Sequence, residues 1–331
     1  MAARRSSTPE GLMLSDARPP GGEPPLDAIA ARVAAIERLP MERVNQGAAS
    51  PWRGFGLAAR EVYDYRELLV NLIRKELKTK YKDSVLGFLW SLLRPMLLLA
   101  VYYVAIGKFL GMTFKLFPIF LFSGLVAWSL FTDVLGGCTG SIVGNAGLIK
   151  KVYFPRELLP LSVVGASLVN FAMQLVVLVV AVLIFGGSLS GQQIWLLPLA
   201  FLALLVFMTA CGLGLAAANV RFRDIQHLIE IVLLLWFWLT PIVYGVGSVL
   251  QRMEASGLHW LAQLYLANPM ASVVIGFQQA VYGSYNDGTT QQTFAGSIAP
   301  RLLVVIAASS VLLWLAQRYF ARDQGNFAQE L

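Results

Sequence analysis

The longest run without a charged side chain limits the folds that this chain can adopt more than any other feature of its sequence. No Asp, Glu, Lys or Arg occurs in the 63 residues from 158 to 220, and the polar stretch GGSLSGQQ (186–193) divides that run near its middle. A helix needs roughly 20 apolar residues to cross the hydrocarbon core of a bilayer. The run therefore predicts two membrane-spanning helices joined by a polar hairpin.

Composition extends this prediction to the whole chain. Hydrophobic residues make up 57% of the sequence and charged residues only 14%, with a mean hydropathy of +0.64. Such values exceed what soluble domains tolerate. Four further apolar runs are long enough to span, at residues 85–107, 116–137, 231–251 and 297–320. We therefore expect an all-α, polytopic membrane protein with six transmembrane helices.

Two ionisable residues fall inside these predicted spans, Arg94 and Asp133. A charge within the bilayer costs at least a few kcal/mol on insertion scales, so both are candidates for function. Each also has a structural interpretation. Arg94 could extend to the interface or pair with an acidic neighbour, and Asp133 could cap a bent helix.

The basic residues predict the orientation. Of 26 Lys and Arg residues, 14 lie in residues 1–82, before the first span. Cytoplasmic segments are enriched in Lys and Arg, and an even number of spans returns the chain to its starting side. We expect a multi-pass protein of the bacterial plasma membrane with both termini in the cytoplasm. Residues 1–60, rich in Pro, Gly, Ala and Arg, are expected to form a mostly disordered extension, and 321–331 a cytoplasmic tail.

An amphipathic segment precedes the transmembrane region 85–320. Residues 61–84 place leucines and an isoleucine at helical spacing, with basic residues on the other face. This pattern is typical of a helix lying in the membrane interface, and a soluble helix that binds a partner is the alternative. Lys78, Lys80 and Lys82 follow in close order at the start of span one.

A seventh apolar region, 258–285, is interrupted by Asn268 and Pro269. Each half has about ten residues, too few to cross a bilayer. We expect two short re-entrant helices forming an outer gate, held at membrane depth by protein or a water-filled cavity. A surface hairpin that caps the outer face is the alternative.

No catalytic constellation or metal site emerges from the sequence. The chain has no phosphate-binding GxxxxGK[ST] motif, since Gly107–Lys108 lacks the upstream glycine and is followed by Phe109. His227 and His259 are too isolated to predict a zinc site. Two isolated intramembrane charges do not provide the acid and base groups of a transferase. We therefore expect a chain that is not itself an enzyme and binds no cofactor.

Two groups of side chains are candidates for recognition. Aromatic rings concentrated in spans one, two and five could line a path for a polymer, or could simply pack in the core or form interface belts; they are Trp90, Tyr102, Tyr103, Trp128, Phe131, Trp236, Phe237, Trp238 and Tyr244. A predicted cytoplasmic loop mixes basic and aromatic side chains, which is typical of a docking surface. Its residues are Lys150, Lys151, Tyr153, Phe154, Pro155, Arg156 and Glu157.

Four ordered motifs carry a family resemblance, and they are spread over about residues 60–320. They are ELKTKYKDSVLGFLWSLLRP (76–95), LIKKVYFPRELLP (148–160), NVRFRDIQHLIEIVLLLWFWLTPIVY (219–244) and LANPM (266–270). Together they resemble the permease subunit of ABC-2 type polysaccharide exporters, which move O-antigen, teichoic acid and related lipid-linked glycans. The N-terminal extension departs from the common pattern.

The resemblance implies the partners. It implies a homodimer that works in membrane lipid with two copies of a separate ATPase, which binds the ATP and Mg²⁺, and it implies no nucleic acid. Residues 150–157 would then couple the permease to that ATPase. The branch that exports actinobacterial cell-wall galactan is the most similar, which implies a polyprenyl-pyrophosphate-linked polysaccharide whose headgroup meets Lys78, Lys80, Lys82 and Arg94. A small-molecule ABC-2 exporter, or a membrane-embedded transferase or flippase acting alone, are the alternatives.

Overall fold

The computed structural model describes residues 56, 60–82, 89–109, 116–184, 193–282, 297–325 and 327–330. Within these ranges every regular element is helical, as expected. The elements are α3 Arg66–Tyr81, α4 Trp90–Tyr102, the π-helical turn η2 Tyr103–Phe109, α5 Phe117–Ser141, the short 3-10 turn η3 Val143–Asn145, α6 Ala146–Ile149, α7 Leu158–Ile184, α8 Leu196–Arg221, α9 Ile225–Trp238, α10 Val246–Ala255, α11 His259–Leu266, α12 Pro269–Tyr282, α13 Ala299–Asp323 and α14 Phe327–Glu330.

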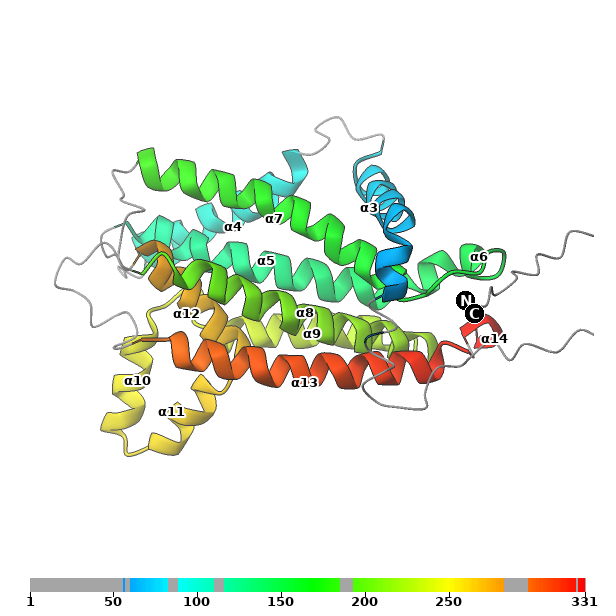
Figure 1. Cartoon of the computed structure of the whole chain (residues 1–331). Helices are drawn as coiled ribbons and strands as arrows, with labels where there is room; N and C mark the ends of the chain where they lie inside the picture. Colours follow the sequence, from blue (N-terminus) through cyan, green and yellow to red (C-terminus); the bar gives the residue numbers. More distant parts are fainter. Residues whose placement is uncertain are drawn as a thin grey trace, which may run out of the picture. The chain divides into compact units, whose positions relative to one another are not determined.

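Helix α5 lies at the centre of the bundle. It packs against α4, α7, α8, α9 and α12, and most of its side chains are buried. A helix that is apolar on all sides is one that is surrounded, by protein or by lipid. Helices α7 and α8 run alongside it and α13 packs against α8, while α10 and α11 lie at one end of the bundle and α3, α6 and α14 at the other (Figure 1).

Small residues permit two of the closest helix contacts. A Cβ added at Gly276 of α12 would lie 2.9 Å from the Cβ of Ala200 on α8. A Cβ added at Gly165 of α7 would lie 2.5 Å from Cδ1 of Ile73 on α3. Helices in membranes associate through van der Waals contact, which small residues bring to short range. These glycines therefore set how closely α12 and α3 approach their neighbours.

Four described helices are long and apolar enough to cross a membrane, namely α5, α7, α8 and α13, or five if the bent pair α11–α12 counts as one. They correspond to four of the six predicted spans. The predicted first span contains α4, with Pro95 inside it, and η2. The count of six remains a prediction.

The predicted fifth span, 231–251, is not one continuous helix. Helix α9 ends at Trp238, seven irregular residues follow, and α10 begins at Val246. Pro241, within the irregular stretch, lacks an N–H donor and restricts the residue before it. The prediction of one continuous spanning helix over residues 231–251 was therefore wrong.

The interruption at Asn268 and Pro269 divides two helices, as predicted. Helix α11 ends at Leu266, α12 begins at Pro269, and the two axes differ by 78°. The membrane depth of this pair, and its role as an outer gate, remain predictions. The expectation for residues 1–60 falls almost entirely outside the described residues.

Candidate functional site

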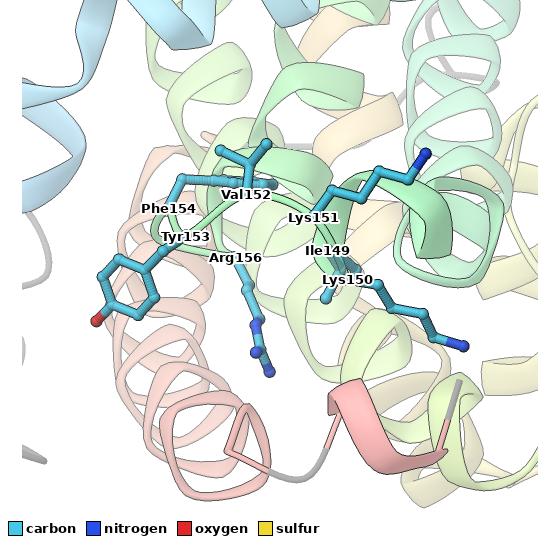
Figure 2. A pocket seen from close by; sticks show the side chains of 7 residues that line it. All are labelled: Ile149, Lys150, Lys151, Val152, Tyr153, Phe154 and Arg156. Atoms are coloured by element: carbon cyan, nitrogen blue, oxygen red, sulfur yellow. The ribbon is translucent and has the colours of Figure 1, made fainter. Parts of the chain in front are cut away.

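The loop between α6 and α7, Lys150–Glu157, borders a hollow of about 240 Å³ on the protein surface (Figure 2). Residues 149–154 and Arg156 line this hollow. The loop sits at the end of the bundle that also carries α3 and α14 (Figure 1). Its position follows from chain connectivity, because α5 and α7 are antiparallel neighbours and the loop joins their adjacent ends.

The α6–α7 loop, which we define as Lys150–Glu157, presents its side chains in two directions. Lys150, Lys151 and Tyr153 are exposed, and the Tyr153 side chain is 83% accessible. Phe154 is buried in a cluster that includes Ile149 of α6 and Leu158 of α7. The buried phenylalanine anchors the loop, so that a tyrosine and two cations remain available to a partner.

The two charged residues that end the loop are partly withdrawn from water. Burial lowers the pKa of Arg156, against the opposing effects of Tyr153 and Glu157. Burial also raises the pKa of the Glu157 carboxyl, and Glu61 adds to this, while a backbone N–H and Arg156 act in the other direction. Removing an ionisable group from water disfavours its charged form. Burial therefore disfavours the charged form of both residues that end the loop.

The lysine-rich segment of α3 makes specific contacts with the bundle. Lys80 Nζ lies 3.4 Å from Asp133 Oδ2 of α5, and Lys75 donates to Asn145 Oδ1. The Tyr81 hydroxyl donates to Asn170 Oδ1 of α7 over 2.8 Å. These contacts, with Leu72 buried beneath them, fix α3 across α7.

Of the four residues predicted to meet a pyrophosphate, the structure describes the side chains of the three lysines. Lys78 and Lys82 are exposed, and Lys80 is half-exposed beside Asp133. Arg94 belongs to α4, and its side chain lies outside the described part of the structure. A common binding site for the four residues therefore remains a prediction.

Most of the predicted path aromatics pack against one another inside the subunit. Phe131 and Trp236 meet edge to face with ring centroids 5.4 Å apart, and Phe237 lies 5.5 Å from Tyr102 and 5.7 Å from Trp128. Trp128, Phe131 and Phe237 are buried, Tyr102, Tyr103, Trp236 and Tyr244 are half-buried, and Trp90 and Trp238 are exposed. Their arrangement in one chain favours core packing, and a role in lining a path stays a prediction.

Asn268 connects the α11–α12 bend to the break after α9. Its Oδ1 accepts from Trp236 Nε1 over 2.9 Å and from the Met270 N–H over 3.0 Å. Its Nδ2 donates to Leu239 O over 3.2 Å and to the Thr240 hydroxyl over 3.3 Å. Irregular backbone at membrane depth is tolerated where neighbouring protein satisfies its polar groups. Asn268 contributes hydrogen bonds to both interruptions.

Within the described residues, no three His, Cys, Asp or Glu side chains gather as a metal site would require. Among the described residues, Glu157 at the end of the α6–α7 loop is the one acidic or basic residue that is buried.

Comparison with known proteins assigns the fold to a family. Residues 67–282 match the ABC-2 type transporter family. The chain belongs to this family. It is 35% identical over 273 residues to the O-antigen export system permease protein RfbA of Myxococcus xanthus, an alignment covering 82% of this chain and 98% of that protein. A protein of the same name from Klebsiella pneumoniae is 29% identical, over 64% of this chain and 79% of its own length. The polysialic acid transport protein KpsM of Escherichia coli is 24% identical, over 69% of this chain and 86% of its own length.

Membership of the ABC-2 family confirms the resemblance that the four motifs carried; the galactan branch stays a prediction. Two features of this ABC-2 chain were missed by the sequence reasoning. Asp133 is paired with Lys80, which could have been suggested by an isolated acid and a lysine cluster near the same membrane face. Phe327, in the expected tail, is buried against Phe320 and has no local sequence signal.

Proposed function

We propose that this ABC-2 chain is the membrane-spanning permease subunit of an exporter that moves a polysaccharide across the plasma membrane. The observation that carries the proposal is the alignment over 98% of an O-antigen export permease. Similarity to a polysialic acid transport protein supports the same substrate class. ATP and Mg²⁺ bind to a separate ATPase subunit, two copies of which join a homodimer of this chain.

The α6–α7 loop is the surface that we propose for the ATPase. Tyr153 is exposed and belongs to a residue type that often dominates binding energy at interfaces, and the exposed Lys150 and Lys151 beside it add positive charge. The buried Phe154 holds the loop in place and supports the transmission of movement to α7. ATP binding and hydrolysis in the partner would then displace the loop and the helices that it joins.

The substrate that we propose is a lipid-linked glycan, specifically a cell-wall galactan on a polyprenyl pyrophosphate. Its headgroup arrives from the cytoplasmic leaflet, where Lys78 and Lys82 are exposed at the end of α3. Lys80 and Arg94 complete the proposed set. Charge-assisted hydrogen bonds from such cations are the strong contacts to phosphate oxygens.

Two measurements test the proposal. Depletion of the chain should cause a lipid-linked polysaccharide to accumulate on the cytoplasmic side, and analysis of that glycan would identify its sugars. Accumulation of a small molecule without any glycan would favour the small-molecule exporter. The tagged chain should also co-purify with a P-loop ATPase, and transport activity by the solitary chain would favour a flippase or transferase acting alone.

A matched pair of variants tests the α6–α7 loop. Tyr153→Ala should weaken retention of the ATPase about tenfold, because an exposed aromatic at an interface centre commonly contributes more than 1 kcal/mol. Tyr63→Ala removes another exposed tyrosine, 67% accessible, and should leave retention unchanged. Equal effects from the two variants would contradict the assignment of the loop.

A further inference from the structure

The C-terminal segment packs against the α6–α7 loop. Phe327, the first residue of α14, is 1% exposed and meets Phe320 of α13 edge to face, with ring centroids 5.4 Å apart. Both rings belong to the buried cluster that contains Phe154. Chain ends are usually poorly ordered unless they are tied down. Burial of an aromatic ring is such a tie, and it places α14 beside the loop.

Arg156 connects the loop to this segment. Its guanidinium carbon lies 5.9 Å from the centroid of the Phe327 ring, within the range of a cation–π interaction. Figure 2 shows the Arg156 side chain directed toward the red C-terminal helix, and Tyr153 pointing away from it. The two side chains thus leave the loop in different directions, one to the protein and one to the surface.

The surroundings of Arg156 make the aromatic contact important. Its Nη1 is buried and has no hydrogen-bond partner among the described residues. Burial lowers the pKa of this guanidinium, with Tyr153 and Glu157 acting against the shift. A cation over an aromatic ring gains more when it is desolvated than when it is exposed. The Phe327 ring therefore compensates a charge that the loop partly removes from water.

We propose that Phe327 is a positioning residue for the α6–α7 loop: its ring braces Arg156 and so holds Lys150–Glu157 in the conformation that receives the ATPase. The inference rests on the proposed function of that loop. Phe320 of α13 packs against the same ring, so α13 and the loop are joined through Phe327. The C-terminal residues then contribute to ATPase binding without touching the partner.

The test uses the full-length permease in nanodiscs with its ATPase. Phe327→Leu retains an apolar side chain in the cluster but removes the ring face. We expect it to weaken ATPase affinity about fivefold to tenfold. Amide hydrogen exchange at residues 150–156 should rise, while the thermal midpoint of the permease changes little. Phe327→Trp, which restores a ring, should recover much of both losses.

A control variant removes another cation–aromatic pair. The guanidinium carbon of Arg318 lies 5.2 Å from the Trp314 ring on α13, and this pair includes no residue of the loop. Trp314→Leu should leave ATPase affinity and exchange at residues 150–156 unchanged. If it loosens the loop as much as Phe327→Leu does, the effect belongs to α13 in general and the proposal is overturned.

A double variant tests whether Phe327 acts through Arg156. Arg156→Met keeps an unbranched apolar stem, leaves Phe327 in place, and should raise loop exchange as Phe327→Leu does. Combining the two substitutions should add little to either alone. Full additivity, or unchanged exchange in both single variants, would overturn the inference. Should Phe327→Leu fail to fold, Arg156→Met alone decides, since unchanged loop exchange would again overturn it.

The proposed function and this inference can fail separately. If Tyr153→Ala leaves ATPase affinity unchanged, the loop is not the docking surface and the proposed function is wrong at this point. If Tyr153→Ala weakens binding and Phe327→Leu does not, only the bracing role is wrong.

Discussion

Glu157 illustrates how one buried acid can make stability depend on pH. The carboxyl is 7% exposed, and burial raises its pKa above the ordinary value. The folded protein therefore holds this proton more tightly than the unfolded chain does. The stabilisation is fully present below the unfolded pKa of about 4.3 and is lost as the pH rises through the higher folded pKa.

We predict that Glu157→Gln raises the thermal midpoint at pH 7 and that this gain disappears near pH 4. The amide keeps the shape of the side chain but removes the charge that burial disfavours. Glu254→Gln is the matched control, since Glu254 is exposed on α10. The thermal midpoint of this variant should equal that of the parent protein at both pH values. A lower midpoint for Glu157→Gln at pH 7 would mean that the attraction of Arg156 outweighs burial.

At the scale of elements, hydrogen bonds from two side chains, Asn268 and Gln278, link two helix interruptions. The break after α9 and the bend between α11 and α12 leave backbone groups without the hydrogen bonds that a continuous helix would provide. Asn268 binds Trp236, Leu239, Thr240 and Met270 across these interruptions. Gln278 of α12 adds a hydrogen bond to Pro241 O over 2.9 Å. The broken helices therefore form one connected unit.

Asn268→Ala should lower the free energy of unfolding by about 1–3 kcal/mol, because it removes the acceptor of the Trp236 and Met270 N–H groups and a donor to the Leu239 carbonyl oxygen. Thermal unfolding in nanodiscs measures the change. Gln263→Ala removes an exposed amide from α11 and should have little effect. If the two variants are equally stable, the Asn268 hydrogen bonds do not hold the interruptions.

At the scale of the whole molecule, the apolar surface left exposed by one subunit must meet lipid or a second copy. Leu234 and Leu235 of α9 are 64% and 60% exposed, and Val304 of α13 is 68% exposed. A path between two copies, lined by spans one, two and five, remains a prediction, and α9 includes the start of the predicted fifth span. The exposed face of α9 is thus the part expected at the interface.

Leu235→Cys should therefore cross-link two copies of the chain with a short thiol-reactive linker in native membranes, to at least about half of the protein. Close approach across a two-fold axis brings equivalent residues together. Val304→Cys is an equally exposed control that should remain monomeric on a denaturing gel. Cross-linking through Val304→Cys alone would move the interface to α13.

Patterns within short windows were sufficient to predict much of the fold. The apolar runs located α5, α7, α8 and α13, and Pro269 correctly marked the division between α11 and α12. The continuity of residues 231–251 was predicted wrongly, because an apolar run does not show that the helix is interrupted near Pro241. Local hydropathy reports which residues avoid water, but it does not report how a backbone continues once neighbours satisfy its polar groups.

The sequence by itself determined the membrane class, the all-helical fold, the family and the loop between α6 and α7. These depend on hydropathy, proline positions and motifs that each occupy a few tens of residues. Only the tertiary structure decided that Lys80 pairs with Asp133, that Phe131 is buried against Trp236, and that Phe327 lies over Arg156. Such pairs join residues far apart in the chain, and their contacts depend on how the helices pack together.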